Sequence, residues 1–136
     1  MSEDKVELGR RVVACKGWRW MPGMRWWTDD DDRGRLDDYQ PEYMGRPTDA
    51  LPDLTDAATV GCMLALVRQA WRCPTVYARE STTRRVSDGV IAWEVCNLYL
   101  DAEACRALGV SREGSVGSWG HGSEAEALVA ALESAP

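Results

Sequence analysis

Hydrophobic and polar positions alternate with two different periods along the chain, a period of three to four residues that is typical of helices and a period of two that is typical of strands. The helical period is clearest near the middle of the chain. Over residues 55–71 apolar side chains recur every three to four positions from Val60 to Trp71, which predicts a helix. Thr55 is the expected N-cap, because its side-chain oxygen can accept a hydrogen bond from the first turn. Few positions in this segment are polar, so we expect neighbouring elements to cover the helix on most sides.

A second helix is predicted near the end of the sequence, over residues 123–134. Ser123 and Glu126 stand three positions apart, which is the spacing of a capping box that satisfies free N–H groups at a helix start. Apolar residues follow at helical spacing. A shorter helical turn is predicted over residues 101–108.

The period of two predicts strands. The large apolar residues Ile91, Trp93 and Val95 alternate with the smaller or polar residues at 92, 94 and 96, which indicates a strand with two distinct faces. We expect strands over residues 8–20, 75–80, 90–99 and 115–119, a polar hairpin loop over 81–89 and a frayed polar terminus over 1–7.

These elements predict an α+β fold, with a small, mostly antiparallel sheet and two helices packed on one of its faces. The length of 136 residues fits a single domain, 1–136, with one hydrophobic core.

Tryptophan is concentrated in one short segment, where four of the seven tryptophans fall within ten residues. Residues 21–24 suit a tight turn, because Pro22 presets φ and Gly23 tolerates positive φ. This pattern predicts a hairpin with three tryptophans and one arginine on one face. The cluster could fill the core, form a protein-binding hot spot or stack a nucleotide base. Its candidate binding residues are Trp18, Arg19, Trp20, Arg25, Trp26 and Trp27.

An acidic run follows directly and opens a long loop or insertion over residues 28–53. Four consecutive carboxylates point in different directions, so a solvated loop is the default expectation and a metal site is not predicted. The functional alternative is a decoy, in which carboxylates imitate a phosphate backbone and occupy an arginine-lined groove. The candidate residues are Asp29, Asp30, Asp31 and Asp32. Arg84 and Arg85, in the predicted loop 81–89, could supplement either binding role of the Trp cluster.

No catalytic or cofactor-binding arrangement is predicted. His121 is the single histidine, and a surface imidazole is its simplest interpretation. The glycines at 114–122 precede a helix but lack the lysine of a phosphate-binding loop. The five cysteines are odd in number and too widely spaced for zinc, so we expect buried thiols. The sequence therefore predicts a protein that is not an enzyme and has no cofactor or metal.

Charge narrows the classes of partner. The net charge of −6, from 22 acidic and 16 basic residues, disfavours binding to nucleic-acid backbones or anionic membranes. No run of 18 apolar residues is present and the first residues are polar, so neither a membrane span nor a signal peptide is expected. We therefore expect a cytoplasmic protein.

Three segments, Gly17–Met24, Ala50–Trp71 and Ser123–Leu132, resemble small uncharacterised proteins encoded by phages and prophages of GC-rich bacteria. The resemblance implies a phage or mobile-element setting and provides no catalytic residues. It also favours a binding role, since small phage accessory proteins are often inhibitors of a host or defence component.

Two functions of different class follow. The leading hypothesis is a non-enzymatic phage accessory protein that binds and inhibits a host or defence-system protein, with the acidic loop as a nucleic-acid mimic. The alternative is a protein that binds or sequesters a nucleotide signal through the Trp/Arg cluster. The sequence leaves a dimer open.

Overall fold

The computed structural model describes residues 2–36, 46–87, 90–97 and 118–135, and it confirms the α+β class. These ranges contain three helices and two antiparallel sheets of three strands each, ordered β2-β1-β3 and β4-β5-β6. The elements are α1 (Glu3–Val13), β1 (Arg25–Trp27), β2 (Arg33–Arg35), β3 (Leu51–Pro52), α2 (Ala57–Ala70), β4 (Val76–Ser87), β5 (Val90–Asn97), β6 (Ser118–His121) and α4 (Glu124–Glu133).

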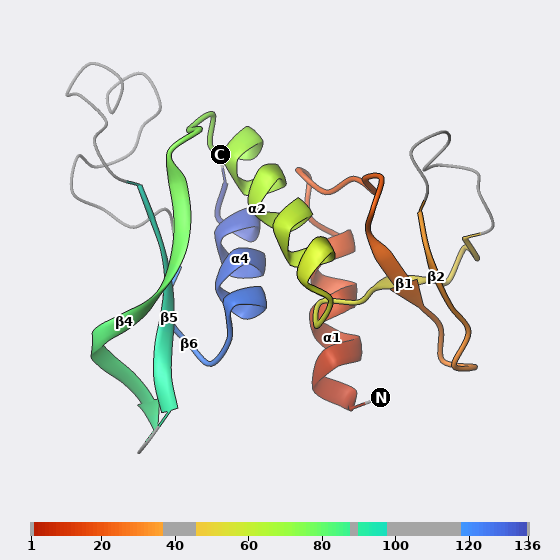
Figure 1. Cartoon of the computed structure of the whole chain (residues 1–136), viewed down its shortest axis with the longest axis horizontal. Helices are drawn as coiled ribbons and strands as arrows, with labels where there is room; N and C mark the ends of the chain where they lie inside the picture. The colour runs from red at the N-terminus through yellow and green to blue at the C-terminus, as the bar shows by residue number, and fades with distance from the viewer. Residues whose placement is uncertain (1, 37–45, 88–89, 98–117, 136) are drawn as a thin grey trace.

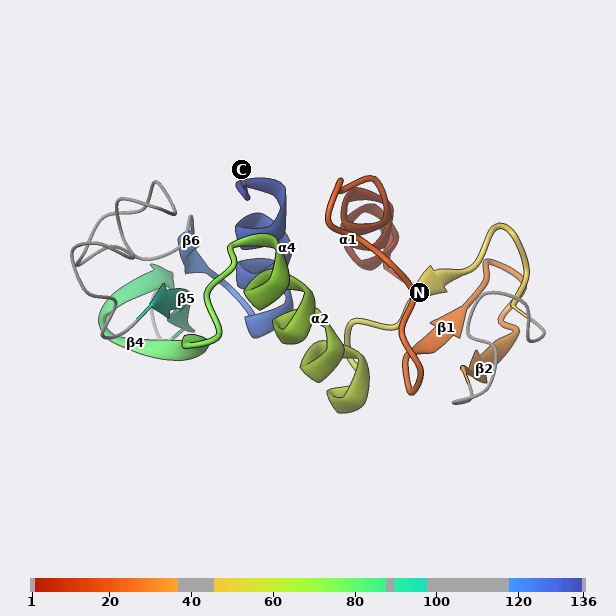
Figure 2. The same cartoon turned by 90° about the horizontal axis from the view of Figure 1, so that it is seen from above.

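The three helices form a layer between the two sheets, as Figures 1 and 2 show from two directions. Helix α4 contacts all three strands of the β4-β5-β6 sheet, and α2 contacts β4 and α4. This is the predicted arrangement of two helices on one sheet, with α1 and a second sheet added to it. Helix α1 joins the two halves, since it contacts both α4 and β3.

The start of the chain differs from the prediction of a frayed terminus over 1–7 and a strand over 8–20. Residues Glu3–Val13 form helix α1. The β-branched pair Val12 and Val13 favoured a strand, but acidic residues occupy the first turn and basic residues the last, which complements the helix dipole. Val12 is fully buried and Val13 packs against the core, so tertiary packing overrides the local β preference.

The predicted Trp hairpin is also wrong, although residues 21–24 do form a turn. Gly23 has φ of 90°, and the N–H of Met24 donates to the carbonyl of Met21, so the turn is closed as expected. It leads from α1 into β1 instead of joining two strands. Strand β1 pairs with β2, with Trp27 opposite Arg33, so the hairpin turn consists of residues 28–32.

The region predicted as one long loop, 28–53, therefore contains strands β2 and β3, while residues 37–45 lie outside the described part. Helix α2 is confirmed within 55–71, but Asp56 and not Thr55 is its N-cap. The Asp56 carboxylate accepts a hydrogen bond from the N–H of Thr59 at 3.0 Å, whereas Thr55 bonds to Asp53.

In the second half of the chain the structure has strands where they are predicted, with different bounds. Strand β4 continues through the predicted loop as far as Ser87, with register shifts beyond Glu80. Strand β6 extends to His121, and the predicted turn at 101–108 lies outside the described residues. Helix α4 has the predicted N-cap: the N–H of Glu126 donates to the Ser123 hydroxyl. The return bond of a capping box is shifted by one residue, because the Glu126 carboxylate accepts from the N–H of Gly122 and not from that of Ser123.

One continuous cluster of buried side chains links all three layers. It includes members of α1, β1, α2, β4, β5 and α4, among them Val12, Trp26, Met63, Leu66, Val76, Val95 and Leu128. Because Trp26 of β1 belongs to the same cluster as residues of the helices, buried contacts attach the β2-β1-β3 sheet to the helix layer.

The cysteines of the described part are free thiols. Cys73 is buried, whereas the other three are only half-buried, in partial agreement with the expectation of buried thiols. Burial raises the pKa of the Cys15, Cys62 and Cys96 thiols. Cys105 lies outside the described residues.

Candidate functional site

Two of the four clustered tryptophans fill the core. Trp26 is 8% exposed and Trp27 is 4% exposed. The indole N–H of Trp27 donates to the carbonyl of Pro52 at 3.3 Å, which ties β1 to β3. Trp26 lies across the backbone of Gly34, its register partner on β2. These two side chains therefore fix the hairpin to the core, and neither exposes an indole face on which a base could stack.

The other two tryptophans lie before β1 and are half-buried. Trp18 and Trp20 meet edge to face, with ring centroids 5.4 Å apart and an interplanar angle of 78°. The guanidinium carbon of Arg46 lies 4.6 Å from the centroid of the Trp20 ring, a cation–π contact. Because the two indoles touch each other, no slot for a flat base lies between them. The neighbouring Arg19 is exposed.

The basic candidates do not gather around the tryptophans. The backbone N–H of Arg25 donates to the Thr59 hydroxyl at 2.8 Å, and its guanidinium Nε lies 3.8 Å from Asp53, so Arg25 joins β1 to the start of α2. Arg84 and Arg85 belong to β4, in the sheet on the other side of the helices (Figure 1). Their side chains lie outside the described part of the structure.

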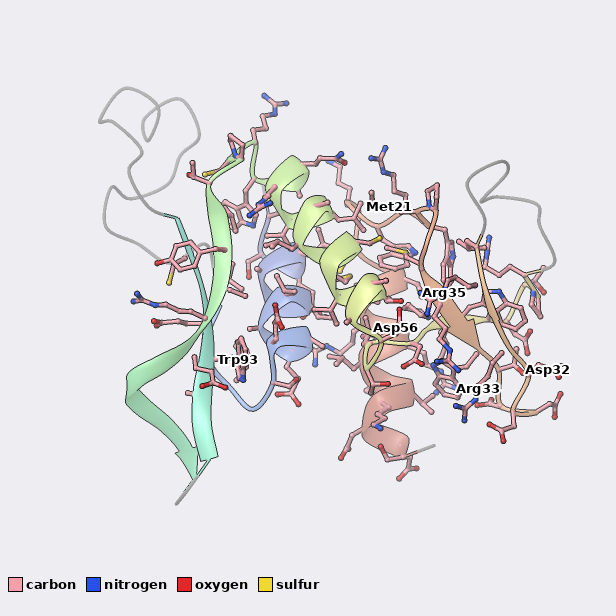
Figure 3. All side chains as sticks on the ribbon, viewed as in Figure 1. Met21, Asp32, Arg33, Arg35, Asp56 and Trp93 are labelled. Atoms are coloured by element: carbon pink, nitrogen blue, oxygen red, sulfur yellow. The ribbon has the colours of Figure 1, made fainter. Side chains whose placement is uncertain are left out.

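The acidic run forms the closed turn of the β1–β2 hairpin, which we call the acidic turn (residues 28–32). The N–H of Thr28 donates to the carbonyl of Asp32, and the N–H of Asp31 donates to the carbonyl of Thr28, both at 3.0 Å. Asp31 has φ of 65°, a left-handed conformation that aspartate tolerates better than most residues. All four aspartates are exposed, and Figure 3 shows Asp32 at the outer end of the hairpin.

One cation balances part of this charge. Arg33 donates to the Asp31 carboxylate at 2.9 Å, and this hydrogen bond, with the guanidinium charge, holds the pKa of Asp31 below its usual value. Asp29, Asp30 and Asp32 form no ion pair within the described residues.

A network of hydrogen bonds fastens the second strand of the hairpin to α2. Arg35 of β2 donates to both carboxylate oxygens of Asp56, at 2.7 and 2.9 Å, and to the carbonyl of Gly23 (Figure 3). Asp56 also accepts from the N–H and the hydroxyl of Thr59. The Arg35 hydrogen bonds, with those from Thr59, hold the pKa of Asp56 well below its usual range. Both strands that carry the acidic turn are thus fixed in place.

Further carboxylates lie at the same end of the molecule. The three helices run in the same general direction, with α2 inclined to the other two, and their N-termini lie at the end of the molecule where the acidic turn lies (Figure 1). Exposed acidic residues occupy the first turns of α1, and Val6 of α1 borders a hollow whose other walls belong to the hairpin. That hollow is lined by Val6, Trp27, Thr28, Asp29, Asp31 and Arg33. We call the region formed by the acidic turn and the N-terminal part of α1 the acidic end.

A groove of about 750 Å³ lies between the N-terminal parts of the three helices. Its apolar lining includes Leu8, Trp27, Pro52, Leu54, Val60 and Ala125. Its charged lining consists of Asp4, Lys5, Asp53, Glu124 and Glu126. The sequence interpretation missed this groove. Its sequence signals were acidic residues such as Glu124 and Glu126 at a predicted helix start, which are common features of helices, and the start of α1 was not predicted as a helix.

The remaining candidates offer little chemistry. His121 is half-buried at the end of β6, opposite Trp93 of β5. The N–H of Gly122 donates to the Glu126 carboxylate. Among the described residues, no three metal-binding side chains gather into a site. The described helices are also too short or too polar to cross a membrane.

Comparison of the chain with protein-family models, curated proteins and solved structures found no match. Function is therefore inferred from the geometry and chemistry of the acidic end and its groove.

Proposed function

We propose that this chain is a non-enzymatic accessory protein that binds and inhibits a host or defence-system protein by occupying a basic, nucleic-acid-binding surface of that partner. The observation that carries the proposal is the acidic turn, where four consecutive carboxylates project from a hairpin fixed to the core by Trp26 and Trp27. The phage setting expected from the sequence resemblance is part of this proposal.

Electrostatics supports a cationic partner. Two unit charges about 7 Å apart in water repel by roughly 0.6 kcal/mol, so adjacent carboxylates carry a modest but repeated penalty. Arg33 relieves it for Asp31 only, among the described residues. An arginine- or lysine-rich surface would relieve it for the others, and the local negative field would accelerate encounter with such a surface.

Rigidity supports the same conclusion. A loop that orders only on binding loses conformational entropy at that step, which weakens affinity. The acidic turn is closed by two backbone hydrogen bonds, and its strands are held by buried indoles and by the Arg35–Asp56 ion pair. The backbone that carries the carboxylates is therefore already ordered before any partner arrives.

The nucleotide-binding alternative receives less support. It needs indoles that can sandwich a base, but Trp18 and Trp20 contact each other and Trp26 and Trp27 are buried. The geometry of the described residues therefore favours the protein-binding proposal.

The test compares a D30N/D32N variant with wild-type protein. Each immobilised protein captures partners from a bacterial lysate, captured proteins are identified by mass spectrometry, and the purified partner is then titrated. We expect the variant to bind the partner about tenfold more weakly, which corresponds to roughly 1.4 kcal/mol. We also expect wild-type protein to displace duplex DNA from that partner.

A D49N/E80Q variant is the matched control, because it removes two exposed negative charges elsewhere on the chain. Both variants should melt like the wild type, since none of the four side chains forms an ion pair within the described residues. Equal affinity of wild type and D30N/D32N for the captured protein would refute a role for the acidic turn.

A further inference from the structure

We infer that the groove between the helix N-termini binds a basic amphipathic segment of the partner protein, with an apolar side chain in the groove and an arginine or lysine against its carboxylates. This inference rests on the proposed function and specifies which chemistry the partner presents.

The apolar part of the groove is open to an incoming side chain. Leu8, Leu54 and Val60 come from three different segments, pack against the core on one side and are only partly buried. Trp27 and Pro52 close the lining behind them. The volume of about 750 Å³ falls within the usual range of ligand sites, which are mostly apolar with a few polar groups.

The charged part of the groove selects the sign of the occupant. Four carboxylates line it against the single ammonium group of Lys5. Asp53 is already bonded to Thr55, and Glu126 accepts from the N–H of Gly122. Asp4 and Glu124 have no ion-pair partner within the described residues, so both are free to meet a cation. An anionic lipid or nucleic acid would be repelled by this rim.

The groove lies next to the hollow beside the acidic turn. Trp27 lines both the groove and the hollow beside the turn, and Asp4 lines both the groove and a second hollow along α1. A partner that sets basic residues against the acidic turn therefore brings its neighbouring surface over the groove. Apolar contact inside a polar, charged rim is the usual composition of a protein-binding hot spot.

Gly61 allows the groove to be filled without disturbing the fold. It lies on α2 and lines the groove, and a Cβ added there would meet nothing within 4 Å. A G61W variant should place an indole in the groove, whereas G61A changes the same position and leaves the groove open. Comparison of G61W with G61A therefore distinguishes the effect of filling the groove from the effect of replacing the glycine.

The experiment selects binders from a random 12-residue peptide display library on the immobilised full chain. Enriched peptides are then synthesised and titrated by fluorescence anisotropy. We expect them to carry a large apolar residue close to arginine or lysine. They should bind wild type and G61A equally, G61W at least tenfold more weakly, and D4N/E124Q three- to tenfold more weakly, with D49N/E80Q unchanged.

The inference would be overturned if no peptide were enriched, or if the enriched peptides lacked basic residues. It would also be overturned if the peptides bound wild type and G61W equally. Circular dichroism establishes that G61W is folded, and D4N/E124Q provides the test if it is not. A captured partner protein that loses affinity for D30N/D32N but not for G61W would refute the groove and leave the proposed function intact. The converse result would refute the role of the acidic turn.

Discussion

Gly34 should be one of the least replaceable residues of the hairpin that carries the acidic turn. A Cβ at this position would lie 2.5 Å from Cζ2 and 2.6 Å from Cε2 of the Trp26 indole. Carbon atoms in contact are about 3.5–4.0 Å apart, so the indole or the strand would have to move by about 1 Å. Trp26 is 8% exposed and belongs to the core cluster, which leaves it little room.

The magnitude for G34A follows from two opposing terms. Overpacking a well-packed site costs about 1–3 kcal/mol, while replacing glycine by alanine gains about 0.4–1 kcal/mol by restricting the unfolded chain. The net loss is about 1–2 kcal/mol. At roughly 2.1 cal/mol/K per residue for 136 residues, each kcal/mol shifts Tm by about 3.5 °C, so G34A should lower Tm by about 3–7 °C.

G61A is the matched comparison, because the same chemical change is made where a Cβ meets nothing within 4 Å. It lies inside helix α2, where alanine is favoured over glycine by up to about 1 kcal/mol, so Tm should rise by about 2–3 °C. Thermal melts followed by circular dichroism measure both variants. Equal stabilisation by G34A and G61A would show that the Trp26 indole does not lie across β2.

Three further predictions concern the contacts around α2 and α1. T59V should lower the free energy of unfolding by about 1–3 kcal/mol in urea titrations, because it leaves the N–H of Arg25 without its acceptor, while T59S should retain most of the stability. Asp56 is stabilised in its charged form by Arg35, so its folded pKa lies below the unfolded value of about 3.9. The stability lost in D56N should therefore be largest above about pH 5 and shrink as the pH falls below about 4, measured by urea titrations across this range. R11Q removes an exposed ion pair and should change the free energy of unfolding by less than about 1 kcal/mol.

The sequence was most informative where local signals and burial agreed. Helix α4 was predicted because Ser123 and Glu126 form a local capping box and the apolar residues behind them are buried. Strand β5 was predicted from its alternation, and Val95 does face the core. In α4 the residues that set the pattern are the residues that pack. In β5 the agreement is partial, because Ala92, on the face opposite Val95 in the predicted alternation, is fully buried as well.

The errors arose where distant contacts decide the structure. Strand β1 has only three residues, and its partners are separated from it by the acidic turn and by the segment before β3. The closure of the turn depends on pairing of Trp27 with Arg33, which no local period reports. Likewise, the groove joins the starts of three helices from opposite ends of the sequence, so no single segment of sequence could have indicated it.

Some carboxylates of the acidic end stabilise the fold, whereas others make no contact that stabilises it within the described residues. Acidic residues in the first turn of a helix stabilise that helix, so Asp4 and Glu124 have a structural reason as well as a place on the groove. Asp31 adopts a conformation that suits aspartate or asparagine and pairs with Arg33. Asp30 and Asp32 have no comparable contact within the described residues, and any small polar residue would serve a turn at these positions. Their charge adds repulsion without a compensating contact inside the described fold. A cationic partner supplies that contact, which is why the acidic turn, rather than the acidity of the chain as a whole, carries the functional proposal.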